Sequence, residues 1–251
     1  MTPIEQAAAL VREAQRIVFL TGAGISTDSG IPDFRGPNGV WTKNPAAERM
    51  ATLEHYLNDP EVRLAAWQNR LAAQNWKAMP NRAHESIVAL EREGKLHAVI
   101  TQNVDGLHQK AGTSDSLVIE VHGTLHRSMC WGCGDKRPML DVLERVKAGE
   151  ADPPCELCGG ILKSDTISFG QNLVPEVIDA AIRMAGTCDL LIAVGTTLAV
   201  FPAASLVPQA KRAGADVIIV NGEPTAMDAY ANVLIRDQIG SALPAILLPT
   251  S

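Results

Sequence analysis

Short apolar runs alternate along the chain with longer stretches in which apolar residues recur every three or four positions. Short runs rich in β-branched residues are typical of buried parallel strands, and the longer period is typical of amphipathic helices. The pattern predicts strands at 17–20, 98–101, 118–120, 190–194 and 217–221. It predicts helices at 2–14, 82–92, 175–185 and 201–213. Strands that alternate with helices predict an α/β fold with a mostly parallel, doubly wound sheet.

Two stretches interrupt this alternation. Residues 38–79 have a helical pattern without a strand, and residues 127–164 contain two pairs of cysteines. We expect both stretches to be insertions that together form a smaller domain. The larger, sheet-containing domain would then comprise 1–37, 80–126 and 165–251.

Polar segments follow five of the apolar strands directly. Because ligands on parallel sheets bind at the carboxyl ends of the strands, these segments are expected to converge on one crevice. The segments are 21–26, 102–105, 122–123, 195–197 and 221–223.

The turn TGAGIS at 21–26 follows the first predicted strand. Gly22 and Gly24 let the backbone approach phosphate oxygens. Thr27 stands where the usual dinucleotide fingerprint has a third glycine, so a plain strand-to-helix turn is an equal reading of the glycines alone. The following loop, SGIPDFRG at 29–36, carries an acid, an aromatic ring and a guanidinium, which is typical of a loop that covers a ligand.

Four of the five cysteines form two Cys-x-x-Cys pairs, Cys130 with Cys133 and Cys155 with Cys158. Their spacing is typical of zinc-ribbon-like sites, although reduced structural thiols or two disulfides are alternatives. Four thiolates leave no open position for water, so the zinc ion would be structural. Cys188 is expected to be a small buried hydrophobic residue.

The net charge of −6 argues against direct nucleic-acid binding, which needs a basic face. No stretch approaches the roughly 18 apolar residues of a membrane span, and the N-terminal region lacks the apolar segment of a signal peptide. We therefore expect a cytoplasmic protein without a membrane partner. The sequence leaves its oligomeric state open.

The motifs taken together resemble those of the sirtuin family, the NAD-dependent protein deacylases. The resemblance extends over about 16–244 and rests on GAGIS at 22–26, SGIPDFRG at 29–36, TQNVD at 101–105, HG at 122–123 and the four cysteines, in this order. It implies a Rossmann-like NAD-binding domain, a small zinc domain, and NAD as a consumed co-substrate. The expected reaction releases nicotinamide and transfers the acyl group from lysine to ADP-ribose.

The resemblance assigns the catalytic roles to His122, Asn103 and Asp105. His122 would be the general base for a ribose hydroxyl, since an unperturbed histidine has a pKa near 6.5. Without the neighbouring motifs, a histidine that satisfies a backbone group at a strand end would be the simpler reading. Asn103 and Gln102 would bind the nicotinamide ribose, and Asp105 with Ile31 would hold the carboxamide. The remaining NAD-binding residues implied are Gly22, Ala23, Gly24, Ser26, Asp33, Phe34, Arg35, Trp41, Val104, Gly195, Thr196, Thr197, Asn221, Gly222, Glu223 and Ile239.

The same resemblance implies that an acyl-lysine peptide binds as an added strand. Ile167 and Phe169 would line the tunnel for the acyl-lysine, while Gly170 and Val200 would offer backbone pairing. Members that prefer succinyl or malonyl groups carry a Tyr-x-x-Arg pair, and the nearest match here, WQNR at 67–70, lacks the phenol. We therefore expect acetyl or longer apolar acyl groups.

Two other functions remain open on the sequence alone. Mono-ADP-ribosyl transfer would share the first bond cleavage but end at an outside nucleophile. A binding module for NAD or acylated lysine would need no turnover, and the joint presence of His122, Asn103 and Asp105 speaks against it.

Overall fold

The computed structural model describes residues 1–33, 39–43 and 47–248. Its larger sheet contains six parallel strands in the order β3-β2-β1-β7-β8-β9. The strands are β1 (Ile17–Thr21), β2 (Leu96–Thr101), β3 (Val118–Glu120), β7 (Leu190–Val194), β8 (Asp216–Val220) and β9 (Val233–Ile235). The order reverses between β1 and β7, which confirms the predicted doubly wound fold, and ligands on such sheets bind beyond the carboxyl ends of the strands at this point.

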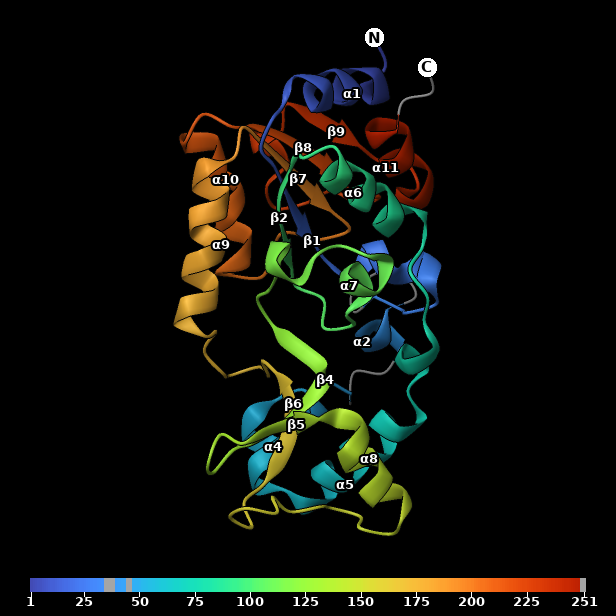
Figure 1. Cartoon of the computed structure of the whole chain (residues 1–251), viewed down its shortest axis with the longest axis vertical. Helices are drawn as coiled ribbons and strands as arrows, with labels where there is room; N and C mark the ends of the chain where they lie inside the picture. Colours follow the sequence, from blue (N-terminus) through green and yellow to red (C-terminus); the bar gives the residue numbers. More distant parts are fainter. Residues whose placement is uncertain (34–38, 44–46, 249–251) are drawn as a thin grey trace.

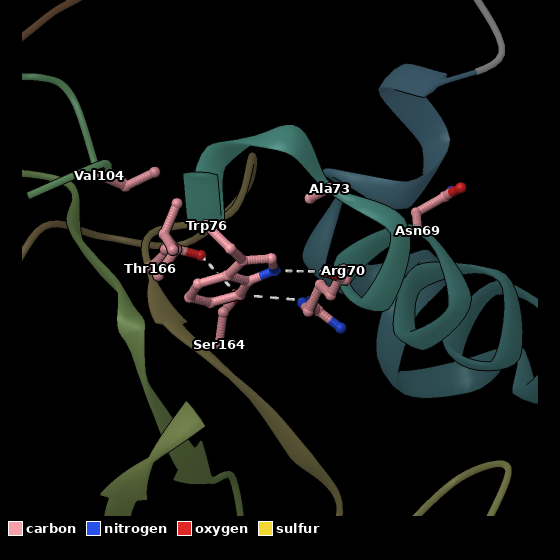
Figure 2. Close-up of a pocket in the computed structure, with 8 residues that line it drawn as sticks. Asn69, Arg70, Ala73, Trp76, Val104, Ser164 and Thr166 are labelled. Atoms are coloured by element: carbon pink, nitrogen blue, oxygen red, sulfur yellow. Dashed lines mark hydrogen bonds between the residues drawn. The ribbon is translucent and has the colours of Figure 1, made fainter. Parts of the chain in front are cut away.

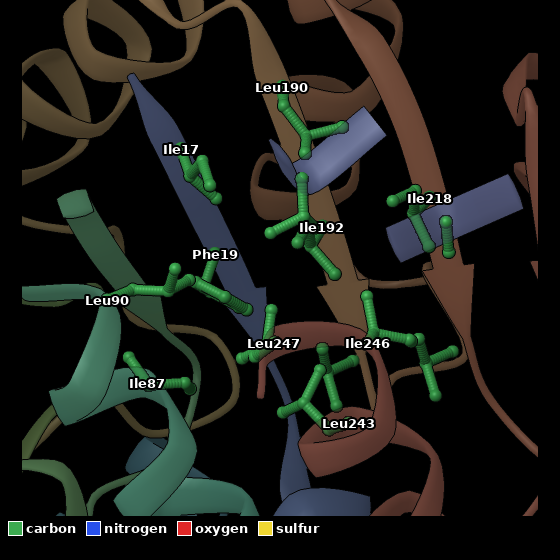
Figure 3. Close-up of a cluster of buried hydrophobic side chains, with 14 of the residues drawn as sticks. Ile17, Phe19, Ile87, Leu90, Leu190, Ile192, Ile218, Leu243, Ile246 and Leu247 are labelled. Atoms are coloured by element: carbon green, nitrogen blue, oxygen red, sulfur yellow. The ribbon is translucent and has the colours of Figure 1, made fainter. Parts of the chain in front are cut away.

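Helices cover both faces of this sheet (Figure 1). One face packs on α1 (Pro3–Glu13), α6 (Arg82–Arg92) and α11 (Ile239–Leu247), and the other packs on α9 (Pro175–Thr187) and α10 (Leu206–Arg212). All five residues of β1 and of β7 are buried, as strands with helices on both sides must be. Figure 3 shows Phe19, Ile192 and Ile218 of the sheet meeting Leu243 and Ile246 of α11.

A second, antiparallel sheet has the order β5-β4-β6 and lies at the other end of the molecule in Figure 1. Its strands are β4 (Gly123–Cys130), β5 (Lys136–Pro138) and β6 (Leu162–Thr166). The helices of this region include α4 (Leu53–Asn58), α5 (Pro60–Ala72) and α8 (Met139–Lys147). Trp67 of α5, Met139 and Val142 of α8, and Leu162 of β6 share one buried cluster. The 38–79 and 127–164 stretches thus pack on each other.

The shorter helices are α2 (Val40–Lys43), α3 (Ala47–Met50) and α7 (Leu107–Ala111). Single 3-10 turns cover Ala23–Ser29, Gln74–Lys77, Asp115–Leu117, Ala203–Ser205 and Asp228–Tyr230. Within the described ranges, none of the helices has both the length and the apolarity needed to cross a membrane.

The five predicted strands are present, with ends that differ by up to two residues. The predicted helix at 201–213 begins later, because Ala203–Ser205 forms a 3-10 turn and α10 starts only at Leu206. Phe201 precedes Pro202, and a residue before proline is disfavoured in the helical region. The pattern did not predict β9 or the three strands of the smaller sheet.

Candidate active site

The turns that follow β1 and β7 interlock at the point where the strand order reverses. The Gly24 amide donates to the Gly195 carbonyl at 2.9 Å, and Gly195 itself has a positive φ of 62°. A Cβ added at Gly24 would lie 2.7 Å from the Gly195 Cα, and one at Gly22 would lie 2.7 Å from the Thr196 Cβ. Only glycine lets these two turns approach so closely.

Side chains from the β1 and β2 turns form one buried cluster. The Ser26 hydroxyl donates to the Asp105 Oδ2 at 2.7 Å. The Asn103 Nδ2 donates to the Gly22 carbonyl at 3.1 Å and to the Ser26 Oγ at 3.2 Å. The other Asp105 oxygen accepts from the Leu107 amide at 2.9 Å, at the start of α7. The predicted partners Asn103 and Asp105 are thus held together, and the Ser26 hydroxyl is committed to Asp105 in this structure.

His122 lies between β3 and β4, and among the described residues its ring is anchored through Nδ1. Its Nδ1 lies 3.0 Å from the Gln102 carbonyl oxygen, so Nδ1 carries the proton and donates it. Nε2 of the neutral ring then keeps a lone pair that can accept a proton. Burial lowers the pKa of the imidazole, and the hydrogen bond to the Gln102 carbonyl partly offsets this. The arrangement is that of a neutral base held in one tautomer.

The Gln102 side chain and the β8 turn link the remaining segments. Gln102 Nε2 donates to the Thr196 Oγ1 at 3.0 Å, which ties the β2 turn to the β7 turn. The Gly195 amide donates to the Val220 carbonyl at 2.9 Å, directly before Asn221. Four of the five predicted segments are therefore joined by hydrogen bonds to one another, and the fifth begins one residue beyond such a bond.

The segment at 221–223 is ordered by an arginine that carries no sequence signal. Arg236 Nη1 donates to the carbonyls of Asn221 and Glu223, each at 2.9 Å. The Asn221 side chain also donates to the Glu223 carbonyl at 2.8 Å. A single arginine in a polar stretch is commonplace, which is why the sequence did not single out Arg236.

The other predicted NAD-binding residues differ in burial and in their backbone contacts. Ala23 and Val104 are half-buried, and Gly222 and Thr197 are exposed. Ile239, the first residue of α11, is partly buried against the core cluster. The Ile31 amide donates to the Ser26 carbonyl at 3.3 Å, and the Asp33 carbonyl accepts from Val40 at 2.8 Å. Phe34, Arg35 and the side chain of Trp41 lie outside the described part of the chain.

Of the predicted peptide-binding residues, Ile167 contacts a candidate site residue directly. The Ile167 amide donates to the His122 carbonyl at 2.8 Å. The Phe169 amide donates to the Ala51 carbonyl at 2.8 Å, and its carbonyl accepts from Leu53 at 2.9 Å. Both backbone hydrogen-bonding groups of Phe169 are therefore paired within the protein. Gly170 is exposed and Val200 is half-buried.

A cavity of about 290 Å³ adjoins this cluster between the α5 region and β6. Figure 2 shows Arg70 and Trp76 on one side of it and Val104 and Thr166 on the other. Val104 lies between Asn103 and Asp105 in the chain, and Thr166 precedes Ile167. The cavity therefore extends from the Asn103–Asp105 cluster toward the smaller sheet.

One guanidinium stands at the wall of this cavity. The Arg70 Cζ lies 4.7 Å from the Trp67 ring centroid and 5.3 Å from that of Tyr56. Its Nη2 donates to the Ser164 Oγ at 3.4 Å, and its Nη1 donates to the Tyr56 hydroxyl at 3.3 Å. The Tyr56 hydroxyl gives its own proton to the Leu162 carbonyl at 2.8 Å. A phenol therefore reaches Arg70 from α4, but its proton is already committed.

The four paired cysteines come together at the end of the smaller sheet. All four Sγ atoms lie within 4.8 Å of one another, with 3.5 Å between Cys130 and Cys158 and 3.7 Å between Cys133 and Cys155. Thiolates that share a tetrahedral zinc ion lie about 3.8 Å apart, whereas disulfide sulfurs lie about 2.05 Å apart. The cysteines are free thiols, so the disulfide alternative is not adopted. His126 is not part of this cysteine cluster: its Nε2 lies 2.9 Å from the Asp105 carbonyl oxygen.

Comparison with known proteins gives the family. The Sir2 family model matches residues 22–202. The chain is 51% identical over 231 residues to NAD-dependent protein deacetylase 2 of Streptomyces coelicolor, covering 92% of this chain and 96% of that protein. It is 42% identical over 243 residues to the NAD-dependent protein deacetylase of Sulfolobus acidocaldarius, covering 97% and 93%.

Solved structures agree with these relatives. A Sir2 enzyme structure superposes with a TM-score of 0.88 at 39% identity, covering 98% of this chain and 96% of that chain. A complex of Sir2 with a p53 peptide and NAD⁺ superposes with a TM-score of 0.85 at 33% identity, covering 97% of each chain. The chain therefore belongs to the Sir2 family, the sirtuins.

Proposed function

We propose that this protein is an NAD-dependent protein-lysine deacylase that transfers the acyl group to ADP-ribose and releases nicotinamide. The observation that carries the proposal is the His122 ring, held through Nδ1 on the Gln102 carbonyl next to the Asn103–Asp105 cluster at the sheet edge. The curated relatives, which are named NAD-dependent protein deacetylases, support the same activity.

The residues at the crevice fit NAD. The interlocked glycine turns lie at the switch point, where dinucleotides bind in such sheets. NAD supplies the electrophilic ribose carbon from which nicotinamide departs. Asp105 and Ile31 would hold the carboxamide, and Asn103 and Gln102 would bind the nicotinamide ribose. Asn221 and Glu223 would bind the adenosine ribose.

The side chains divide the work between binding and proton transfer. Because the Ser26 hydroxyl donates to Asp105, we assign Ser26 to the orientation of that carboxylate rather than to phosphate binding. His122 would accept the proton of a ribose hydroxyl at Nε2, while Nδ1 stays on the Gln102 carbonyl. The Gln102 bond to Thr196 fixes that carbonyl relative to the β7 turn.

An acyl-lysine peptide is the second substrate. Gly170 and Val200 would pair with the peptide backbone, since the Phe169 backbone is already paired with Ala51 and Leu53. Ile167 would lie next to the reacting amide, because its own amide is bonded to the His122 carbonyl. The Phe169 ring would cover the lysine stem.

The four thiolates would hold one structural zinc ion, since their sulfur spacing fits a closed tetrahedral site. Such a site needs reduced thiols, and a cytoplasmic location would supply them. We also retain the division into an NAD-binding domain and a smaller zinc-containing domain as a proposal.

The test is turnover with NAD and a library of acetylated peptides, with mass-spectrometric detection of products. Deacylation predicts deacetylated peptide together with O-acetyl-ADP-ribose and nicotinamide in equal amounts. Nicotinamide release with ADP-ribosylated protein and no deacetylated peptide would instead identify an ADP-ribosyltransferase. Binding of NAD without nicotinamide release would identify a binding module.

A further inference from the structure

Two histidines are buried directly behind the Asn103–Asp105 cluster, and neither has a role in the reaction described above. His84 on α6 is 0% exposed and His108 on α7 is 1% exposed. Their rings meet edge to face, with centroids 5.0 Å apart. Burying an imidazole costs free energy unless its nitrogens form hydrogen bonds, so the contacts of these two rings need an explanation.

The contacts of His108 lead to the active site through two threonines. The His108 Nε2 lies 3.0 Å from the Thr21 Oγ1, at the end of β1. The Thr21 hydroxyl donates to the Thr101 Oγ1 at 2.9 Å, at the end of β2. The Thr101 Oγ1 also accepts the backbone N–H of Asn103 at 3.1 Å. These four residues form a chain of hydrogen bonds, the His108 relay.

The direction of this relay fixes the tautomer of His108. The single proton of the Thr21 hydroxyl goes to Thr101, so the His108 Nε2 must donate its proton to Thr21. Nδ1 then carries only a lone pair, and it has no hydrogen-bond partner among the described residues. The opposite direction would leave a buried N–H at Nδ1 without an acceptor, and orphaned N–H groups are rarer than unsatisfied acceptors.

Both rings are suited to remaining neutral. Burial lowers the pKa of His108 to about 3 and that of His84 to about 4. His84 Nδ1 accepts from the Asn81 amide at 3.4 Å, so its proton is on Nε2, and this N–H has no acceptor among the described residues. A neutral pair keeps the donor at His108 Nε2 available throughout the pH range in which His122 can act as a base.

The relay ends on the residue expected to bind the nicotinamide ribose. The backbone of Asn103 is held by Thr101, and its side chain is held by Gly22 and Ser26. Without the Thr101 contact, only the side-chain hydrogen bonds of Asn103 to Gly22 and Ser26 would fix its position. We propose that His108, packed against His84, is a positioning residue that holds Asn103 in place for NAD through Thr21 and Thr101. This inference rests on the proposed function.

The experiment compares variants along the relay. His108→Leu removes the donor at similar bulk, and His108→Gln returns an N–H donor near the position of Nε2. Thr21→Val removes the central hydroxyl with little change of shape and serves where His108→Leu does not fold. The matched control is Thr113→Val: Thr113 is 3% exposed and lies near His108, but its hydroxyl has no partner among the described residues.

Expected results separate positioning from a purely structural role. His108→Leu and Thr21→Val should lower kcat/KM for NAD by about 10-fold or more, the cost of one unpaired buried polar group, with KM for the peptide unchanged. His108→Gln should recover most of the loss, and Thr113→Val should match the wild type. If His108→Gln does not recover activity, or if losses only follow the folded fraction, the proposal is overturned.

Hydrogen exchange gives a readout that does not depend on turnover. The Asn103 amide should exchange faster in His108→Leu and Thr21→Val, while the amides of β4 and β6 keep their wild-type rates. An Asn103 amide with unchanged protection in both variants would overturn the relay even if activity fell. A wild-type protein that binds but does not deacylate would refute the proposed function and leave the exchange test of the relay intact.

Discussion

One hydrogen bond distinguishes the two ring nitrogens of His122. Nδ1 is held on the Gln102 carbonyl, so in the proposed mechanism Nε2 would face the substrate. The sequence could name His122 only through the resemblance, since a histidine at a strand end would otherwise be read as satisfying a backbone group. It could not give the tautomer, because Gln102 lies 20 positions away in the chain.

Replacement of this base should stop deacylation without unfolding the protein. We expect His122→Ala to lower kcat by about 100- to 10,000-fold, the range for a lost acid–base group. The melting temperature should stay close to that of the wild type, since the ring is only half-buried. His97→Ala, a half-buried histidine of β2 bonded to Thr187, is the control and should retain activity. Activity of His122→Ala within a few-fold of wild type would remove His122 from the mechanism.

The pH dependence follows from the direction of the His122 pKa shift. A general base works in its neutral form, so the rate falls as the pH drops through its pKa. Burial lowers the pKa of His122 from the usual value of 6.5. The acid limb of the kcat/KM profile for the acyl peptide should therefore have its midpoint below pH 6.5. A midpoint above that value would contradict the assignment.

Among the elements, the turns after β1 and β7 depend on each other. A Cβ at Gly24 would collide with the Gly195 backbone, whereas a Cβ at Gly186 in α9 would have nothing within 4 Å. We expect Gly24→Ala to lower the free energy of unfolding by about 1–3 kcal/mol, as overpacking does, and to weaken NAD binding. Gly186→Ala should raise stability by up to about 1 kcal/mol. Urea denaturation measures the stability of both variants, and NAD titration measures their affinity for NAD. Equal changes in Gly24→Ala and Gly186→Ala would contradict the dependence of the two turns on each other.

The cavity between the α5 region and β6 should favour apolar acyl groups. Most of its wall is apolar, the Tyr56 proton is committed to Leu162, and Arg70 is stacked on two rings. A carboxylate would lose its hydration without gaining the full set of donors. We expect kcat/KM at least about 10-fold higher for acetyl or butyryl peptides than for a succinyl peptide of the same sequence. Faster removal of succinyl would show that Arg70 rearranges to bind it.

The elements that the sequence predicted are those with a continuous apolar pattern. β1 and β7 are fully buried and stood out, whereas β6 contains Lys163, Ser164 and Asp165 and did not. Lys163 is buried, but its ammonium bonds to backbone carbonyls of Ser164 and Thr166. Its burial depends on tertiary contacts that no local pattern encodes.

At the scale of the whole molecule, the sequence motifs predicted which segments meet, but not the connections between them. The convergence of strand ends follows from a general property of parallel sheets. The cavity at Arg70 and the His108 relay join residues from distant parts of the chain through single side-chain contacts. Such contacts depend on the packed positions of helices, which periodicity alone does not determine.

The smaller sheet should depend on its metal. We expect Cys155→Ser to lose zinc and to unfold the cluster around Trp67 and Met139, because a structural zinc site contributes folding free energy directly. Metal analysis and tryptophan fluorescence measure the two effects. Cys188→Ala, which changes a buried cysteine of the large sheet region, should keep one equivalent of zinc. Less than half an equivalent in the fresh wild-type protein would contradict the site.

β4 begins at Gly123, the neighbour of the His122 base, and ends at the cysteine ligand Cys130. A strand rises about 3.3 Å per residue, so His122 and the proposed zinc site are separated by the length of one strand. Oxidants or alkylating electrophiles that remove the zinc ion would therefore disturb the position of the His122 ring. They would inactivate the enzyme without entering the NAD site.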